Sequence, residues 1–189
     1  MLGLSAAIVS YLVGSFPTAY VIGKHFRKID LSRNGSGNLG AMNAYEVTGS
    51  KSIGIVVALI DMSKGFLVTS LSFWNYGIII GLTAALFVVI GHNYSLYVRF
   101  KGGRGLATAA GALLVLQPLA VPLYLFIYFM LRMLSVKLYL SSVIGIALAS
   151  VPLFVKMYPA PVPLMLSAGL ILAVLSKHLT PLKTEIKDA

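Results

Sequence analysis

The stretch HNYSLYVRFKGGRG, residues 92–105, carries three cations and three glycines between two apolar runs. The run before it, residues 77–91, and the run after it, residues 106–116, contain no charged residue. Lys and Arg are excluded from the hydrocarbon core of a bilayer and gather in loops on its cytoplasmic side. The stretch therefore predicts a loop between two membrane segments, and the distribution of cations in the remaining chain assigns it to the cytoplasmic side.

The composition is that of a membrane protein. Of 189 residues, 58% are hydrophobic and only 11% are charged, whereas about 25% are charged in an average soluble domain. Several apolar runs approach the ~20 residues that cross a bilayer as a helix. We predict an all-α, polytopic integral membrane protein with a single membrane domain over residues 1–189. Cysteine is absent, so disulfides, Cys-based metal sites and Cys nucleophiles are excluded.

Seven transmembrane helices are expected. They lie near residues 2–23, 52–74, 77–91, 106–116, 119–131, 138–155 and 162–176. Pro118 separates the fourth from the fifth, because proline ends or kinks a helix; the alternative, one long kinked helix, would reverse the topology after it. No Lys or Arg precedes Lys24, so the first segment is interpreted as a retained helix rather than a cleaved leader.

The cations are distributed asymmetrically. Thirteen of the fifteen fall in predicted loops or the tail, at residues 24–51, 92–105, 132–137 and 177–189. The positive-inside rule assigns these segments to the cytoplasm, with the N-terminus outside and the C-terminus inside. In a soluble protein the net charge of +10 would suggest nucleic acid; here topology explains it, and no nucleic-acid partner is expected.

Two charged residues fall inside the second segment. Asp61 and Lys64 are three positions apart, which puts them on one face of a helix. A lone charge within a membrane is costly, so we predict a structural ion pair. The alternative is that Asp61 carries a proton or an ion.

A second glycine-rich loop, NGSGNLGAMN at residues 34–43, is expected on the same side. Its glycines match G-x-G-x-x-G, but that pattern indicates dinucleotide binding only within a βαβ unit, which does not fit here. Glycines nevertheless let successive N–H groups face an anion, and a helix N-terminus adds partial positive charge. The alternative is a tight turn alone. The candidate binding residues are Ser36, Gly37, Asn38, Gly40 and Asn43.

The loop at residues 92–105 has the same character. Two cations and three glycines directly precede the apolar run that begins at Leu106, which predicts a phosphate cradle. The alternative, a positive-inside anchor, explains the cations but not the glycines. His92 is interpreted as a hydrogen-bond donor to a phosphate or as a general base; the alternative is a plain interfacial histidine. The cradle residues are Lys101, Gly102, Gly103, Arg104 and Gly105.

Four stretches resemble the bacterial acyl-phosphate:glycerol-3-phosphate acyltransferases of the PlsY type. They are GSFPTAYVIGK at 14–24, GSGNLGAMN at 35–43, DMSKG at 61–65 and GHNYSLYVRFKGGRGLATAAG at 91–111. The resemblance implies an enzyme of the bacterial inner (cell) membrane with seven spans and a cytoplasm-facing site. It would transfer a fatty acyl group from acyl phosphate to the 1-hydroxyl of glycerol 3-phosphate, giving lysophosphatidate and phosphate, without a cofactor or metal.

The resemblance also implies site residues. We expect catalytic roles for His92, Lys101, Ser36 and Asn38, and substrate binding by Gly37, Gly40, Asn43, Gly102, Gly103, Arg104, Gly105, Ser142 and His178. No Cys or Ser-His-Asp triad is recognisable, so we expect direct transfer, with the proton taken by His92 or by the donor phosphate. Glu46 stands where the family usually has arginine. Either Arg33 or Lys51 restores this charge, or Glu46 favours an acceptor with a positive group.

Two other functions remain open at this point. The same cradles would serve a transporter of organic phosphates, although transporters commonly show internal repeats and none is convincing here. A catalytically altered relative with a different acceptor is the other, and Glu46 is the feature that supports it.

Overall fold

The protein is a bundle of helices. Its structure, a computed structural model, describes residues 1–187, and the side chains of Thr180 and of residues 182–187 lie outside the described set. The predicted cytoplasmic cations Lys183 and Lys187 are among those side chains. The helices are α1 (Leu2–Ser15), α2 (Thr18–Arg27), α3 (Ala41–Thr48), α4 (Lys51–Asn93), the 3-10 turn η1 (Leu96–Val98), α5 (Leu106–Leu116), α6 (Ala120–Met133), α7 (Leu138–Met157) and α8 (Pro161–Lys187). No strand occurs in residues 1–187, which confirms the all-α prediction.

Among the described residues, four helical stretches are long and apolar enough to cross a membrane: Leu2–Arg27, Lys51–Val98, Leu138–Met157 and Pro161–Leu179. The predicted second and third segments both lie in α4, where Gly77 (φ 79°, ψ −173°) interrupts the helix. Helices α5 and α6 are apolar, but with 11 and 14 residues they are shorter than the ~20 that span a bilayer. The count of seven crossings and the orientation of the termini therefore stay predictions.

The expectation of one continuous helix over residues 2–23 is wrong. Helix α1 ends at Ser15, and α2 begins only at Thr18, after a non-helical Phe16 and Pro17. Proline has no N–H to donate and disfavours helical conformation in the preceding residue, so the apolar run bends here. The predicted loop 24–51 likewise contains a helix, α3.

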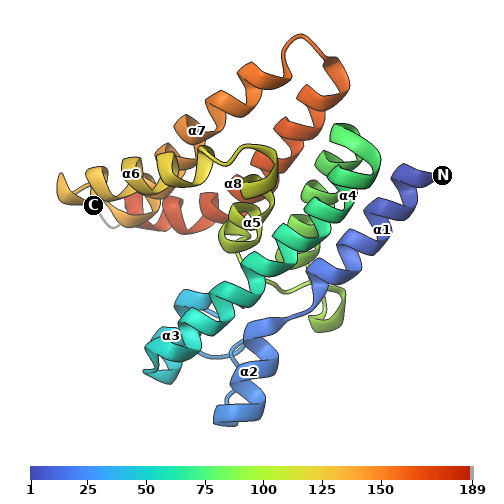
Figure 1. The fold of residues 1–189 in the computed structure, drawn as a ribbon. Coiled ribbons are helices and arrows are strands. Elements are labelled where there is room, and N and C mark those ends of the chain that lie inside the picture. Colours follow the sequence, from blue (N-terminus) through green and yellow to red (C-terminus); the bar gives the residue numbers. More distant parts are fainter. Residues whose placement is uncertain (188–189) are drawn as a thin grey trace.

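Helix α4 is the centre of the bundle, with α1 along one side and α5 and α8 along others, while α2 and α3 lie together at one end (Figure 1). Its contact with α5 is close: a Cβ on Gly65 would lie 1.9 Å from Thr108 O, and one on Gly111 would lie 1.9 Å from Met62 O. Small residues permit such backbone approach in membrane helices. Large apolar side chains face outward in both halves, including Leu4, Ile8, Leu67, Leu71, Met165 and Leu172, as expected for a lipid-facing surface.

Candidate functional site

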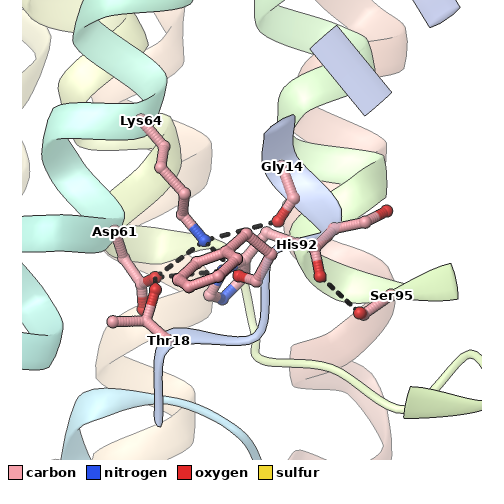
Figure 2. A network of polar contacts seen from close by, with 8 residues as sticks. Gly14, Thr18, Asp61, Lys64, His92 and Ser95 are labelled. Atoms are coloured by element: carbon pink, nitrogen blue, oxygen red, sulfur yellow. Dashed lines mark hydrogen bonds and ion pairs between the residues drawn. The ribbon is translucent and has the colours of Figure 1, made fainter. Parts of the chain in front are cut away.

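The break between α1 and α2 meets a buried ion pair on α4. Lys64 Nζ lies 2.9 Å from Asp61 Oδ1, and both side chains are at least nine-tenths buried, which confirms the predicted pair. Lys64 Nζ also donates to the carbonyl oxygens of Gly14 (3.3 Å) and Phe16 (2.9 Å) (Figure 2). Carbonyls at a helix C-terminus lack helical partners and form the negative end of the helix dipole. The ammonium therefore stabilises both the carboxylate and the end of α1.

The Asp61 carboxylate has two further neighbours. Thr18 Oγ1, in the first turn of α2, donates to Asp61 Oδ1 at 2.8 Å. His92 Nδ1, at the end of α4, lies 3.7 Å from the same oxygen. Figure 2 shows Thr18, Lys64 and His92 converging on this carboxylate. One buried oxygen thus connects the start of α2 with both halves of α4.

The loop at residues 92–105 folds back onto the end of α4. The N–H of Gly103 donates to His92 O at 3.0 Å, and the N–H of Leu39 donates to Gly102 O at 3.1 Å, which joins the two glycine-rich loops. A Cβ on Gly103 would lie 2.0 Å from His92 Nε2, and one on Gly102 would lie 2.2 Å from His92 O. Close packing therefore explains why both positions are glycine. The N–H of Gly103 is also already used in a hydrogen bond within the protein.

The loop at residues 34–43 is organised by the buried side chain of Asn43. Its Oδ1 accepts from the N–H (2.9 Å) and the hydroxyl (3.1 Å) of Ser36. Its Nδ2 donates to the carbonyl oxygens of Leu31 and Asn34, each at 3.2 Å. Asn43 therefore bonds to the loop itself, and Ser36 bonds to Asn43.

Asp30 fixes the turn that leads into this loop. Its Oδ1 accepts from the hydroxyl (2.7 Å) and the N–H (3.0 Å) of Ser32, and Arg33 Nε lies 3.7 Å from its Oδ2. The hydrogen bond from the Ser32 hydroxyl is the main reason that the pKa of Asp30 lies below its usual value. The carboxylate therefore stays ionised at neutral pH and holds the turn.

A polar cavity of about 270 Å³ opens between the two glycine-rich loops, helices α4 and α6, and the ends of α5, α7 and α8. Seven predicted site residues line it: Asn38, Gly40, His92, Arg104, Gly105, Ser142 and His178. Asp61 and the rings of Tyr124, Tyr128 and Tyr139 also line it. The fold thus brings both loops and the C-terminal half of the chain to one cavity.

Other predicted site residues do not line this cavity. They are Ser36, Gly37, Asn43, Lys101, Gly102 and Gly103. Lys101 is exposed, whereas Gly102 and Gly103 support the wall from behind through His92. Glu46, Arg33 and Lys51 are also exposed and outside the cavity, so neither Arg33 nor Lys51 supplies it with a cation.

The cavity wall includes a helix N-terminus and a cation. Helix α5 begins after Gly105, which has φ 79° and gives no side-chain cap, and its first residues, Leu106 and Ala107, line the cavity. Arg104 lies beside them with its guanidinium 4.7 Å from the centre of the Tyr139 ring, and it is the one Lys or Arg among the described lining residues. Helix N–H groups and a guanidinium both bind phosphate oxygens.

The cavity also has hydrogen-bonding groups on α6, α7 and α8. The Ser142 and Tyr124 hydroxyls are 3.1 Å apart. His178 Nδ1 lies 2.9 Å from Val174 O, so Nδ1 must carry the proton and Nε2 is the acceptor of the neutral ring. Within the described residues no group of three or more His, Asp or Glu could hold a metal ion.

A second, apolar cavity of about 220 Å³ adjoins the polar one. It lies between α5, α6, α7 and α8 and is lined mainly by Ala, Leu, Ile and Val side chains. Leu106, Ala107 and Tyr124 line both cavities. The wall with Arg104 and the start of α5 and the apolar space are therefore neighbours.

Sequence reasoning missed two members of the site. It paired Asp61 with Lys64 or made it a carrier of a proton or an ion, and it gave Thr18 no role. Asp61 Oδ1 nevertheless lies 3.7 Å from His92 Nδ1, and Thr18 donates to the same oxygen. Pro17 was the available signal, because a break at proline frees carbonyl groups that a lysine on a neighbouring helix can bind.

The comparisons with known proteins agree with one another. Residues 4–187 match the family model described as glycerol-3-phosphate acyltransferase. A relative from Moorella thermoacetica, named glycerol-3-phosphate acyltransferase 2, is 40% identical over 86% of this chain and 82% of its own. One of the same name from Bacillus anthracis is 39% identical over 90% and 88%.

The fold has a solved counterpart. A crystal structure of PlsY, an integral membrane glycerol 3-phosphate acyltransferase in its glycerol 3-phosphate form, superposes with a TM-score of 0.88. It is 28% identical, and the match covers 98% of this chain and 92% of that one. The chain therefore belongs to the glycerol-3-phosphate acyltransferase family of integral membrane proteins.

Proposed function

We propose that the protein transfers a fatty acyl group from acyl phosphate to the 1-hydroxyl of glycerol 3-phosphate, giving lysophosphatidate and inorganic phosphate. The observation that carries this is the junction of the two cavities at Leu106, Ala107 and Tyr124. A molecule with a phosphate at one end and a hydrocarbon chain at the other matches a cationic wall that continues into an apolar space. Family membership favours this role over the transporter.

The donor phosphate binds Arg104 and the first turn of α5. This revises the expectation of a cradle at Gly102 and Gly103, because the Gly103 N–H already donates to His92 O. Lys101, exposed on the same loop, attracts the anionic substrates from solution. The acyl chain lies in the apolar cavity between α5, α6 and α7, among side chains such as Ala110 and Ala149.

The acceptor occupies the polar cavity near Asn38 and Gly40 on one side and Ser142 and His178 on the other. Its 1-hydroxyl oxygen forms the new bond to the acyl carbonyl carbon, and the bond from that carbon to the phosphate oxygen breaks. The hydroxyl proton passes to His92 or to the departing phosphate. Acyl phosphate is already activated, so the site's main tasks are alignment and charge stabilisation. PlsY has been crystallised in glycerol 3-phosphate and lysophosphatidic acid forms, which supports the same ligands here.

We further propose one membrane domain with seven spans, the N-terminus outside, in the bacterial cell membrane. The cations of the loops at residues 24–51, 92–105 and 132–137 support a cytoplasmic position for the cavity. Surrounding membrane lipids contact the apolar outer face.

The direct test measures phosphate release by the purified protein in lipid bilayers, with palmitoyl phosphate as donor. We expect release that requires glycerol 3-phosphate and yields lysophosphatidate in equal amount. A folded protein that releases no phosphate would refute the proposal. In that case glycerol 3-phosphate uptake into sealed vesicles would support the transporter alternative.

A further inference from the structure

The buried carboxylate of Asp61 faces more groups than its ion pair needs. Asp61 is 1% exposed and lines the polar cavity, and its Oδ1 meets Thr18, Lys64 and His92. We infer that Asp61 is a positioning residue for acyl transfer, holding the imidazole of His92 in the orientation in which it serves the reaction. This inference rests on the function proposed above.

The carboxylate is itself firmly held. The Thr18 hydroxyl donates to Oδ1 at 2.8 Å, and Lys64 Nζ lies 2.9 Å from the same oxygen. Lys64 is in turn held by the carbonyls of Gly14 and Phe16. Contacts from α1, α2 and α4 therefore fix the carboxylate, so it provides a rigid reference point beside the cavity.

The position of the Asp61 carboxylate beside His92 affects which ring nitrogen of His92 is basic. Nδ1 faces Asp61 at 3.7 Å, while Nε2 packs against Gly103, where a Cβ would lie only 2.0 Å away. A carboxylate beside Nδ1 favours the tautomer protonated there and leaves Nε2 as the basic nitrogen. The distance exceeds that of a hydrogen bond, and contacts of catalytic groups commonly shorten when substrate binds.

The competing explanation is that Asp61 only neutralises Lys64. The two explanations separate when both charges are removed together, in Asp61→Asn with Lys64→Met. Asn can still accept from Thr18, and Met fills the space of the lysine stem, so no unpaired charge is buried. If Asp61 only balances charge, this double variant retains activity. If Asp61 positions His92, the double variant folds but loses turnover.

The experiment compares this double variant with the wild type in lipid bilayers, using palmitoyl phosphate and glycerol 3-phosphate. We expect kcat to fall by about tenfold or more, while both KM values change by less than about twofold. If Asp61 acts through His92, the effects of the Asp61 and His92 substitutions on kcat should not be additive. In a His92→Gln background the same double substitution should lower kcat by less than about twofold, because the positioned group is already gone. Equal losses in both backgrounds would overturn the inference, and so would unchanged kcat.

A second variant keeps the test decisive if the double variant does not fold. Thr18→Val removes one hydrogen bond to Asp61 and leaves both charges in place. It should lower kcat by about threefold or more with KM unchanged, and it should have no effect in the His92→Gln background. An active wild type with unaffected Thr18 and Asp61 variants would overturn only this inference. A wild type that forms no lysophosphatidate would instead overturn the proposed function.

Discussion

Lys64 Nζ lies 2.9 Å from the carbonyl oxygen of Phe16, a residue 48 positions earlier in the chain. Pro17 breaks the helix at this point, and the lysine binds the carbonyl of Phe16, which also accepts from the N–H of Thr18 at 3.0 Å. Lys64→Met would remove this bond and leave Asp61 buried without a counter-ion. We expect a loss of about 3–5 kcal/mol in unfolding free energy, measured as a lower thermal unfolding midpoint in detergent.

Lys51→Met is the matched control for this prediction. Lys51 begins the same helix but is exposed, so its removal should change the unfolding free energy by about 0.5 kcal/mol or less. Equal midpoints for the two variants would contradict the capping role of Lys64.

Arg104 should dominate binding of the donor phosphate. Charge-assisted hydrogen bonds contribute about 1.5–3 kcal/mol, so Arg104→Gln should lower kcat/KM for palmitoyl phosphate by roughly 10- to 100-fold. Arg99→Gln removes an exposed arginine of the same loop, outside the cavity, and should have little effect at moderate salt. Lys101→Ala should give a smaller, salt-sensitive loss. A larger loss at Lys101 than at Arg104 would place the phosphate elsewhere.

Local sequence signals predicted much of the fold. The apolar run at residues 106–116 coincides with α5, because a glycine-rich loop precedes it and Gln117-Pro118 follows it. The Asp61–Lys64 pair was predictable because helical periodicity alone determines that the two side chains share a face. The break at Pro17 was overlooked because the hydrophobic run continues past it.

The arrangement of the site depended on contacts between distant parts of the chain. Lys101 and Arg104 are three residues apart in one loop, yet only Arg104 lines the cavity. Which of the two residues lines the cavity depends on the turn at Gly105 and on the hydrogen bond from Gly103 to His92. The spacing of the charges reveals neither. The hydrogen bond of Thr18 to Asp61 spans 43 positions and arises only when α2 packs against α4.

Two asparagines of the loop at residues 34–43 should behave differently. Asn43 is buried and bonds to Ser36, Leu31 and Asn34, so Asn43→Ala should destabilise the loop and increase its cleavage by protease. Asn38 lines the cavity, so Asn38→Ala should raise KM for glycerol 3-phosphate by about tenfold at an unchanged unfolding midpoint. Limited proteolysis and acceptor kinetics distinguish the two effects, and identical behaviour would contradict the separate roles.

Gly103 should be intolerant of even one added carbon. A Cβ there would lie 2.0 Å from His92 Nε2, so Gly103→Ala must displace the imidazole or the loop. We expect kcat to fall by at least about tenfold with a modest decrease in unfolding midpoint. Gly3→Ala is the control, since a Cβ at Gly3 meets its nearest atom only at 3.9 Å. Wild-type kcat in Gly103→Ala would show that the orientation of His92 is unimportant.

The apolar cavity should determine the preferred acyl chain length. Ala110 lies on its wall with the shared residues Leu106 and Ala107, and a phenyl ring at this position would occupy part of the space. We therefore expect Ala110→Phe to lower kcat/KM for palmitoyl phosphate by about tenfold or more, because a long chain then loses buried methylenes at about 0.8 kcal/mol each. Octanoyl phosphate should be affected far less, since its chain ends nearer the polar cavity. Kinetics with both donors at saturating glycerol 3-phosphate measure this ratio, and an equal loss for the two donors would mean that the chain lies outside this cavity.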